Sequence, residues 1–106
     1  MKEYLIKFDK LKWEKTGERV EQKVYSYGHQ RIRLVKFYDN FVEKEWCKNG
    51  HIGFVLKGEM KINFNGNFIS YKQGDGLWIE KGEKSKHKVF VEKGKQIELI
   101  LFETEK

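Results

Sequence analysis

Four side chains able to bind a metal ion stand out in this chain: Glu45, Cys47, His51 and His87. If a three-residue turn at 48–50 joins two strands, Cys47 lies opposite His51, and Glu45 shares their face because side chains in a strand alternate. We expect His87 to face the interior of the fold as well. The resulting oxygen, sulfur and two nitrogens suit zinc or iron(II), and the cofactor of this arrangement would be a divalent metal: zinc, iron, manganese or nickel.

A second register of the same turn leads to different chemistry. If Asn49 and Gly50 alone form a two-residue turn, Trp46 lies on the face of His51, and Glu45 and Cys47 point away from it. Aromatic rings in a pocket can stack on a flat metabolite or a sugar ring. The ligand pocket of this arrangement would contain Trp46, His51, Trp78 and His87. Both registers are compatible with the sequence.

The elements that must position these side chains are expected to be strands. The chain contains 10 glycines and neither proline nor alanine, and its apolar positions hold mostly β-branched and aromatic residues. Such residues favour strands, whereas a helical bundle normally relies on alanine and other strong helix formers. The apolar patterns predict strands at 32–38, 43–48, 52–56, 60–64, 67–71, 77–80, 87–91 and 96–102.

Tight turns join these predicted strands, which favours an all-β fold. Residues 27–29 form one expected turn, and the pairs Asn49-Gly50 and Asn65-Gly66 are typical of two-residue hairpins. Antiparallel strands must close or stack to protect their edges, so we predict a jelly-roll β-barrel. We expect one domain over 1–106, with the barrel core at about 30–102 and a strand or an irregular arm at about 1–29.

The composition also bears on location and partners. A single cysteine excludes an internal disulfide, and no apolar run is long enough for a transmembrane helix or has the form of a secretory signal, so we expect a cytoplasmic protein with no membrane contact. The formal net charge of +6 raises the question of nucleic-acid binding. The basic residues are spread along the chain and lysine far outnumbers arginine, which disfavours nucleic acid as the partner.

The motifs in the second half of the chain resemble those of the cupin superfamily. The resemblance lies in the segment 54–62, the turn Asn65-Gly66, the segment 73–75, and the positions of Ile79 and Gly82. It covers roughly residues 30–102 and implies a small antiparallel barrel. The resemblance alone does not indicate one activity, because cupins include dioxygenases, isomerases, epimerases, sugar-binding regulators and storage proteins.

The four metal-ligand positions of the cupin motifs do not hold the usual residues here. When the first motif is aligned on Gly58, its glutamate position falls on His51. Its two histidine positions fall on Glu45 and Cys47 with one spacing of the motif, and on residues 44 and 46 with the other. The histidine position of the second motif falls on residue 85, two residues before His87. The resemblance implies a homodimer, which is common among small cupins. Because the usual ligands are missing, we expect the protein to bind a small metabolite or sugar-like ligand inside the barrel. The alternative is a metal-dependent cupin enzyme of the dioxygenase or isomerase type, and the third is a basic-surface nucleic-acid binder.

Overall fold

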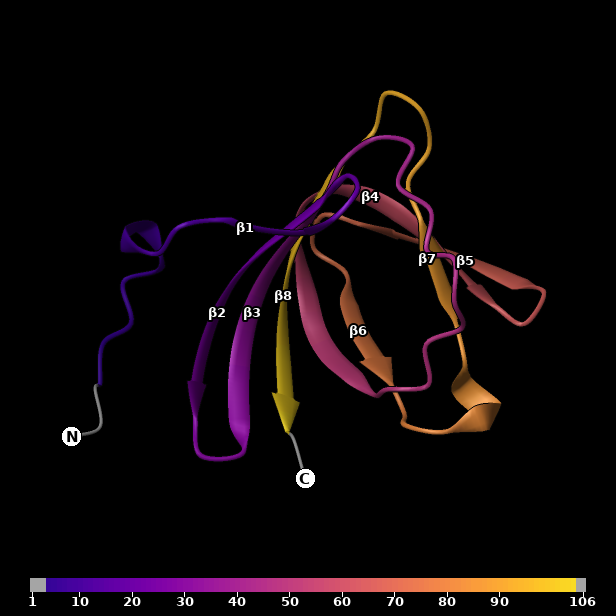
Figure 1. Ribbon diagram of the computed structural model, residues 1–106. Helices are drawn as coiled ribbons and strands as arrows, with labels where there is room; N and C mark the ends of the chain where they lie inside the picture. The colour runs from indigo at the N-terminus through magenta and orange to yellow at the C-terminus, as the bar shows by residue number, and fades with distance from the viewer. Residues whose placement is uncertain (1–3, 105–106) are drawn as a thin grey trace.

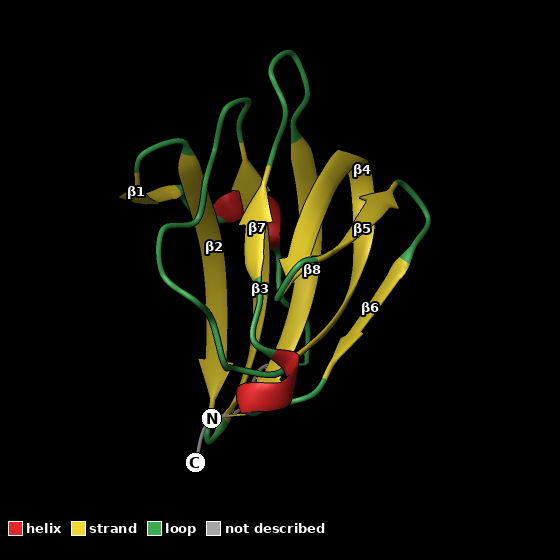
Figure 2. Cartoon of the chain, turned by 90° about the vertical axis from the view of Figure 1, so that its right-hand side faces the viewer, coloured by secondary structure: helices red, strands yellow, loops and turns green. Residues whose placement is uncertain are grey.

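The computed structural model describes residues 4–104, and its regular structure consists mainly of antiparallel strands (Figures 1 and 2), which confirms the predicted all-β fold. Two short 3₁₀ turns accompany the strands: η1 precedes the first strand, and η2 lies between β6 and β7. The elements in chain order are η1 (Phe8–Lys10), β1 (Glu14–Gly17), β2 (Val20–Tyr27), β3 (Gln30–Phe37), β4 (His51–Phe64), β5 (Asn67–Lys72), β6 (Gly76–Ile79), η2 (Glu83–Ser85), β7 (Lys88–Phe90) and β8 (Ile97–Thr104).

Strand β4 connects the two halves of the curved sheet. Its first half pairs with β8 on one side and β6 on the other, and its second half pairs with β5 and β7. The register shifts between Val55 and Lys57, so a bulge bends the strand there. Figure 1 shows the resulting half-barrel, with β1, β2, β3 and β8 on one side and β5 and β7 on the other. The predicted strands at 52–56 and 60–64 are thus one bent strand.

Gly58 makes this bend sterically possible. It adopts a φ of 79°, and a Cβ at this position would collide with the backbone carbonyl of Gln96. Only glycine takes such a φ without strain and lets the two strands approach so closely. The glycine of the first cupin-like motif therefore has a structural role at the corner of the barrel.

The core lies inside the half-barrel, on the concave face of the strands. Along β8 the buried positions are Ile97, Leu99 and Leu101, as the alternation of apolar residues predicted. Val55 and Ile62 fill the same core from the two halves of β4. The buried side chain of His87 is the only polar one fully inside this core among the described residues.

The two Asn-Gly pairs have different conformations. Asn65 and Gly66 have positive φ values of 53° and 104° and form the predicted two-residue turn between β4 and β5. Asn49 and Gly50 have no positive φ, and the predicted hairpin of 43–48 with 52–56 does not form. The physical reason is that β6 and β8 already occupy both edges of β4 there.

The segment predicted as a strand at 43–48 instead runs irregularly beside β7. Isolated bridges join Val42 to Phe90 and Cys47 to His87, and neither of the two hairpin registers describes this pairing. In the predicted N-terminal region, described residues 14–27 form β1 and β2, and β2 pairs with β3 across the turn at 28–29. The first three residues of that region lie outside the described residues. No helix between residues 4 and 104 is long and apolar enough to cross a membrane.

Candidate metal centre

Three of the four predicted metal ligands meet inside the half-barrel. One ligand atom from each of Cys47, His51 and His87 lies within 4.8 Å of the other two. Cys47 Sγ is 3.6 Å from His51 Nε2, and the two imidazole rings lie nearly perpendicular with their centroids 5.3 Å apart. Glu45, the fourth predicted ligand, is exposed and lies outside this cluster.

Each of the three side chains reaches the cluster from a different segment of the chain. His51 is the first residue of β4. Its side chain points inward like that of Val55, because residues four apart in a strand lie on the same face. His87 lies between η2 and β7, and its backbone exchanges two hydrogen bonds with the backbone of Cys47. This bridge brings Cys47 beside His87 although 40 positions separate them in the sequence.

The hydrogen bonds of the two histidines leave both Nε2 atoms available. His51 Nδ1 lies 2.9 Å from Glu103 Oε2, and His87 Nδ1 lies 2.9 Å from the carbonyl oxygen of Ser85. A carboxylate and a carbonyl only accept, so each Nδ1 carries a proton and donates it. Histidines that bind metals usually hold their second nitrogen in this way.

The separation of Cys47 Sγ and His51 Nε2 fits a zinc ion. With a Zn–S bond of about 2.3 Å, a Zn–N bond of about 2.0–2.1 Å and a tetrahedral angle, the sulfur and nitrogen must be about 3.6 Å apart. The observed separation of Cys47 Sγ and His51 Nε2 is 3.6 Å. A soft thiolate with two imidazoles is a donor set that zinc and iron(II) accept. The residues present therefore fit a divalent metal with three protein ligands.

Without a metal, the cluster forms a charged pair. Hydrogen bonds from His51 and then His87 lower the pKa of the Cys47 thiol to about 6. Burial opposes the charged imidazolium of His51, but the contacts with Cys47 and Glu103 outweigh it and raise the pKa of His51 to about 9. Burial also opposes charge on His87, and its contacts with Cys47 and the Ser85 carbonyl raise its pKa. Near neutral pH, Cys47 and His51 are thus a thiolate and an imidazolium.

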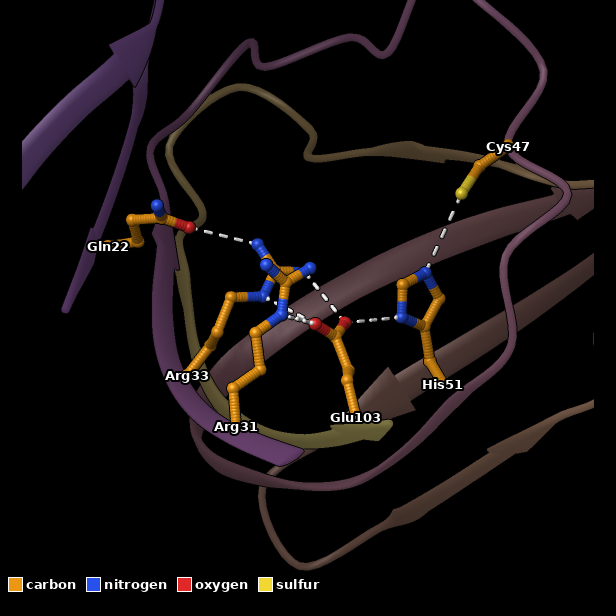
Figure 3. A network of polar contacts seen from close by, with 6 residues as sticks. All are labelled: Gln22, Arg31, Arg33, Cys47, His51 and Glu103. Atoms are coloured by element: carbon orange, nitrogen blue, oxygen red, sulfur yellow. Dashed lines mark hydrogen bonds and ion pairs between the residues drawn. The ribbon is translucent and has the colours of Figure 1, made fainter. Parts of the chain in front are cut away.

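A group of charged residues on β3 and β8 surrounds His51 (Figure 3). The Glu103 carboxylate accepts hydrogen bonds from Arg31, Arg33 and His51, and Arg33 also donates to Gln22. Burial alone would raise the pKa of Glu103, but His51 and the two arginines hold that pKa well below the usual carboxyl range. These residues are absent from the sequence-based site.

A signal for three of these residues exists in the sequence. Arg31 and Arg33 alternate with apolar residues in β3, so both must lie on one face of that strand. Glu103 continues the alternation of Ile97, Leu99 and Leu101, which places it on the inner face. A carboxylate on an inner face needs a charged partner, and the arginines of the neighbouring strand provide it.

A cavity of about 310 Å³ opens beside the cluster. It is lined on one side by core residues and on the other by polar side chains that include Gln22, Arg31, Arg33, Glu43 and Asn49. Glu43 Oε1 accepts a hydrogen bond from the backbone N–H of Val89. The cluster therefore lies at the wall of a partly polar cavity that is large enough for a small ligand.

The two tryptophans of the predicted pocket lie on the outside of the barrel. Trp46 lies under the ammonium groups of Lys86 and Lys88, whose Nζ atoms are 5.2 and 4.7 Å from its ring centre. Trp78 is 74% exposed and points away from the neighbouring buried Leu77 and Ile79. The structure thus brings His51 and His87 together and leaves the two tryptophans apart from them. For Trp78 the reason is that neighbouring residues in a strand alternate between faces.

No family profile matches the sequence, and no curated protein is similar to it. Similar solved structures exist. The polyketide cyclase RemF from Streptomyces resistomycificus has a TM-score of 0.79 at 13% identity, covering 95% of this chain and 78% of that one. KdgF from Halomonas sp. has a TM-score of 0.76 at 16% identity, covering 100% and 96%. An RmlC-like cupin from Shewanella frigidimarina has a TM-score of 0.74 at 14% identity, covering 95% and 91%. Identities this low show the fold alone, and by that measure the chain has the fold of the cupin superfamily.

Proposed function

We propose that this protein binds a divalent transition metal, zinc or iron(II), through Cys47, His51 and His87, and binds a small polar molecule in the adjacent cavity. The observation that carries the proposal is the convergence of the three ligand atoms within 4.8 Å with both Nδ1–H groups already bonded elsewhere. The proposal takes its metal from the second of the three functions considered from the sequence, without Glu45 as a ligand and without a specified reaction, and its small ligand from the first.

Three protein ligands are typical of a catalytic metal site. Structural zinc sites usually have four protein ligands, whereas catalytic sites keep one position for water or substrate. A metal in such a site acts as a Lewis acid and lowers the pKa of a bound water. The chain itself supplies the cavity wall, with Arg31 and Arg33 on the polar side of it. We therefore propose a small polar ligand that reaches the metal through this cavity.

Metal analysis tests the proposal directly. Protein purified without a chelating tag and supplemented with zinc or iron(II) should retain about one ion per chain by elemental analysis. Cobalt(II) substitution should add an intense sulfur-to-cobalt charge-transfer band in the near ultraviolet. Cys47→Ser should remove both the stoichiometric metal and the band, because the thiolate is a ligand.

Glu45→Gln is the matched control for that experiment. Glu45 lies two residues from Cys47 but is exposed and outside the cluster, so the variant should bind metal as the wild-type protein does. Failure of the wild-type protein to retain metal after supplementation would rule out the metal site. A ligand screen by thermal shift would then test the metal-free binding protein, since a ligand specific for the folded state stabilises it. Nucleic-acid binding stays a prediction.

We also propose that the protein is a homodimer. On the outer face of the sheet, one apolar row crosses five paired strands and consists of Tyr25, Ile32, Phe102, Ile52 and Trp78. Ile52, Phe102 and Trp78 are 43%, 47% and 74% exposed. In an isologous dimer with a two-fold axis, the apolar row of one copy would pack against the same row of the other copy.

We propose a cytoplasmic location as well, because a metal-binding Cys47 must remain reduced. Cell fractionation would test this location.

A further inference from the structure

The carboxylate of Glu103 uses its full capacity as an acceptor. Its Oε1 receives hydrogen bonds from Arg31 Nε at 2.7 Å and Arg33 Nε at 3.0 Å. Its Oε2 receives hydrogen bonds from Arg33 Nη2 and from His51 Nδ1, both at 2.9 Å. Two carboxylate oxygens offer about four lone-pair positions, so all four are occupied. The side chain is only 8% exposed, and it therefore has a single defined orientation.

We propose that Glu103 is a positioning residue of the metal centre: its carboxylate holds the His51 ring so that Nε2 faces Cys47, an inference that rests on the proposed metal site. The ring of a free histidine can present either nitrogen. The hydrogen bond to Glu103 keeps a proton on Nδ1. In the neutral ring the lone pair is therefore on Nε2, the nitrogen that would bind the metal.

The arginines keep the carboxylate in place. Arg33 forms a two-pronged contact with both oxygens of Glu103, and its remaining nitrogen, Nη1, donates to Gln22 at 2.9 Å. Figure 3 shows the resulting chain of contacts from Gln22 on β2 through Arg33 on β3 and Glu103 on β8 to His51 on β4. Four neighbouring strands therefore fix the orientation of one imidazole, and the two-pronged arginine–carboxylate contact adds geometric specificity.

Glu103 differs in kind from the group that orients the second histidine. His87 Nδ1 donates to the backbone carbonyl of Ser85, which no side-chain substitution removes. The orientation of His51 depends on a side chain, so a single substitution can change it. This asymmetry makes the role of Glu103 testable while the other two ligands remain unaltered.

Glu103→Gln tests this role most directly, because it keeps the shape of the side chain and replaces one acceptor oxygen of the carboxylate with an NH₂ donor. Either orientation of the amide turns an N–H group toward the N–H donors of the arginines or of His51. If it faces His51, the ring must accept at Nδ1 and carry its proton on Nε2, where the metal would bind. We expect zinc affinity to fall roughly 10- to 100-fold, as for other outer-shell partners of ligating histidines. Competition with a chromophoric chelator measures this change.

Two controls accompany the variant. Glu98→Gln alters another carboxylate of β8, one that pairs with Lys36 and does not touch the cluster, and it should leave the zinc affinity unchanged. ¹⁵N NMR of the zinc-loaded proteins identifies the metal-bound nitrogen and the protonated nitrogen of His51. A purely structural Glu103 would lower stability but leave Nε2 as the ligand in every variant. Unchanged zinc affinity together with an unchanged Nδ1–H in Glu103→Gln would overturn the proposal.

Arg33→Gln serves if Glu103→Gln does not fold. It removes the two-pronged contact and leaves Arg31 and His51 on the carboxylate, so the zinc affinity should fall by less than in Glu103→Gln but measurably, about 3- to 10-fold. An affinity equal to that of the wild-type protein would then overturn the proposal. If the wild-type protein binds neither zinc nor iron(II), the proposed function fails, and ¹⁵N NMR of the metal-free protein at pH 10 still decides whether Glu103 sets the tautomer of His51.

Discussion

Cys47 is the only cysteine in the chain, so the state of its thiol can be followed without interference. Two imidazoles lie beside it and lower its pKa to about 6. A thiolate is the form of cysteine that reacts with alkylating agents and binds metals. The chemistry of the proposed centre can therefore be measured at a single atom.

The alkylation rate of Cys47 in the metal-free protein should follow a titration near pH 6 instead of the usual range near 8.5. The cause is the stabilisation of the thiolate by His51 and His87. Iodoacetamide labelling followed by mass spectrometry between pH 4.5 and 9.5 measures the rate. Zinc should protect the thiol, and His51→Ala should move the midpoint to higher pH. A midpoint unchanged by that substitution would contradict the assigned contact.

Metal binding should release a proton at neutral pH. The pKa of His51 is about 9, so at pH 7.5 its ring carries a proton that the metal must displace. Apparent zinc affinity should therefore increase by about one log unit per pH unit between pH 7 and 9, where Cys47 is already a thiolate, and level off above pH 9. Calorimetry in buffers of different ionisation enthalpy counts the protons released. An affinity independent of pH between 7 and 9 would contradict the raised pKa.

At the scale of the elements, the bend of β4 decides how the site is assembled. The strand crosses from one half of the sheet to the other at the bulge before Gly58. His51 lies at its beginning, in the half that pairs with β6 and β8, while β7, next to His87, pairs with the other half. Without the bend, these two histidines would belong to separate faces of a flat sheet.

Gly58→Ala should destabilise the fold by about 2–3 kcal/mol. The residue has a φ of 79°, which strains any residue with a Cβ, and that Cβ would also collide with the Gln96 carbonyl. Urea unfolding followed by tryptophan fluorescence measures the change. Gly76→Ala is the control, because Gly76 has no positive φ and its added Cβ would lie 3.7 Å from the nearest atom. Equal stabilities of the two variants would contradict the role of Gly58 in the bend.

At the scale of the whole molecule, the inner and outer faces of the sheet carry different kinds of surface. The inner face holds the core, the cavity and the candidate metal centre, and the outer face carries the apolar row of Tyr25, Ile32, Phe102, Ile52 and Trp78. Large exposed apolar side chains that adjoin one another are typical of association surfaces. The outer face can therefore support a dimer without obstructing the site.

Trp78→Lys should weaken the proposed dimer by more than tenfold. Trp78 is the most exposed side chain of the row, and a tryptophan that becomes buried in an interface can contribute about 2 kcal/mol or more. A lysine at this position would also add a positive charge to each copy at the interface. Sedimentation velocity over a range of concentrations measures the dissociation. Phe68→Lys, at an exposed position of β5 outside the row, is the control and should leave the association unchanged. A wild-type protein that is monomeric at high concentration would contradict the proposal.

Local pattern was sufficient for several parts of this protein. The alternation along β8, the positive φ values of Asn65-Gly66 and the all-β architecture follow from neighbours in the sequence, because strand period and turn conformation are local properties. The metal-binding residue types could also be recognised, and three of the four selected residues lie together. Their grouping, however, did not arise from the hairpin that the second Asn-Gly pair suggested.

Tertiary structure alone decided how these residues meet. Both edges of β4 are occupied by β6 and β8, so Cys47 pairs with His87 instead of joining a hairpin with His51. The contact of His51 with Glu103 likewise joins residues 52 positions apart. Which strands pair with an edge of β4 depends on the whole sheet, so a short stretch of the sequence does not reveal it. The sequence by itself determined which chemistry was available to this protein, and the pairing of distant strands determined where that chemistry is assembled.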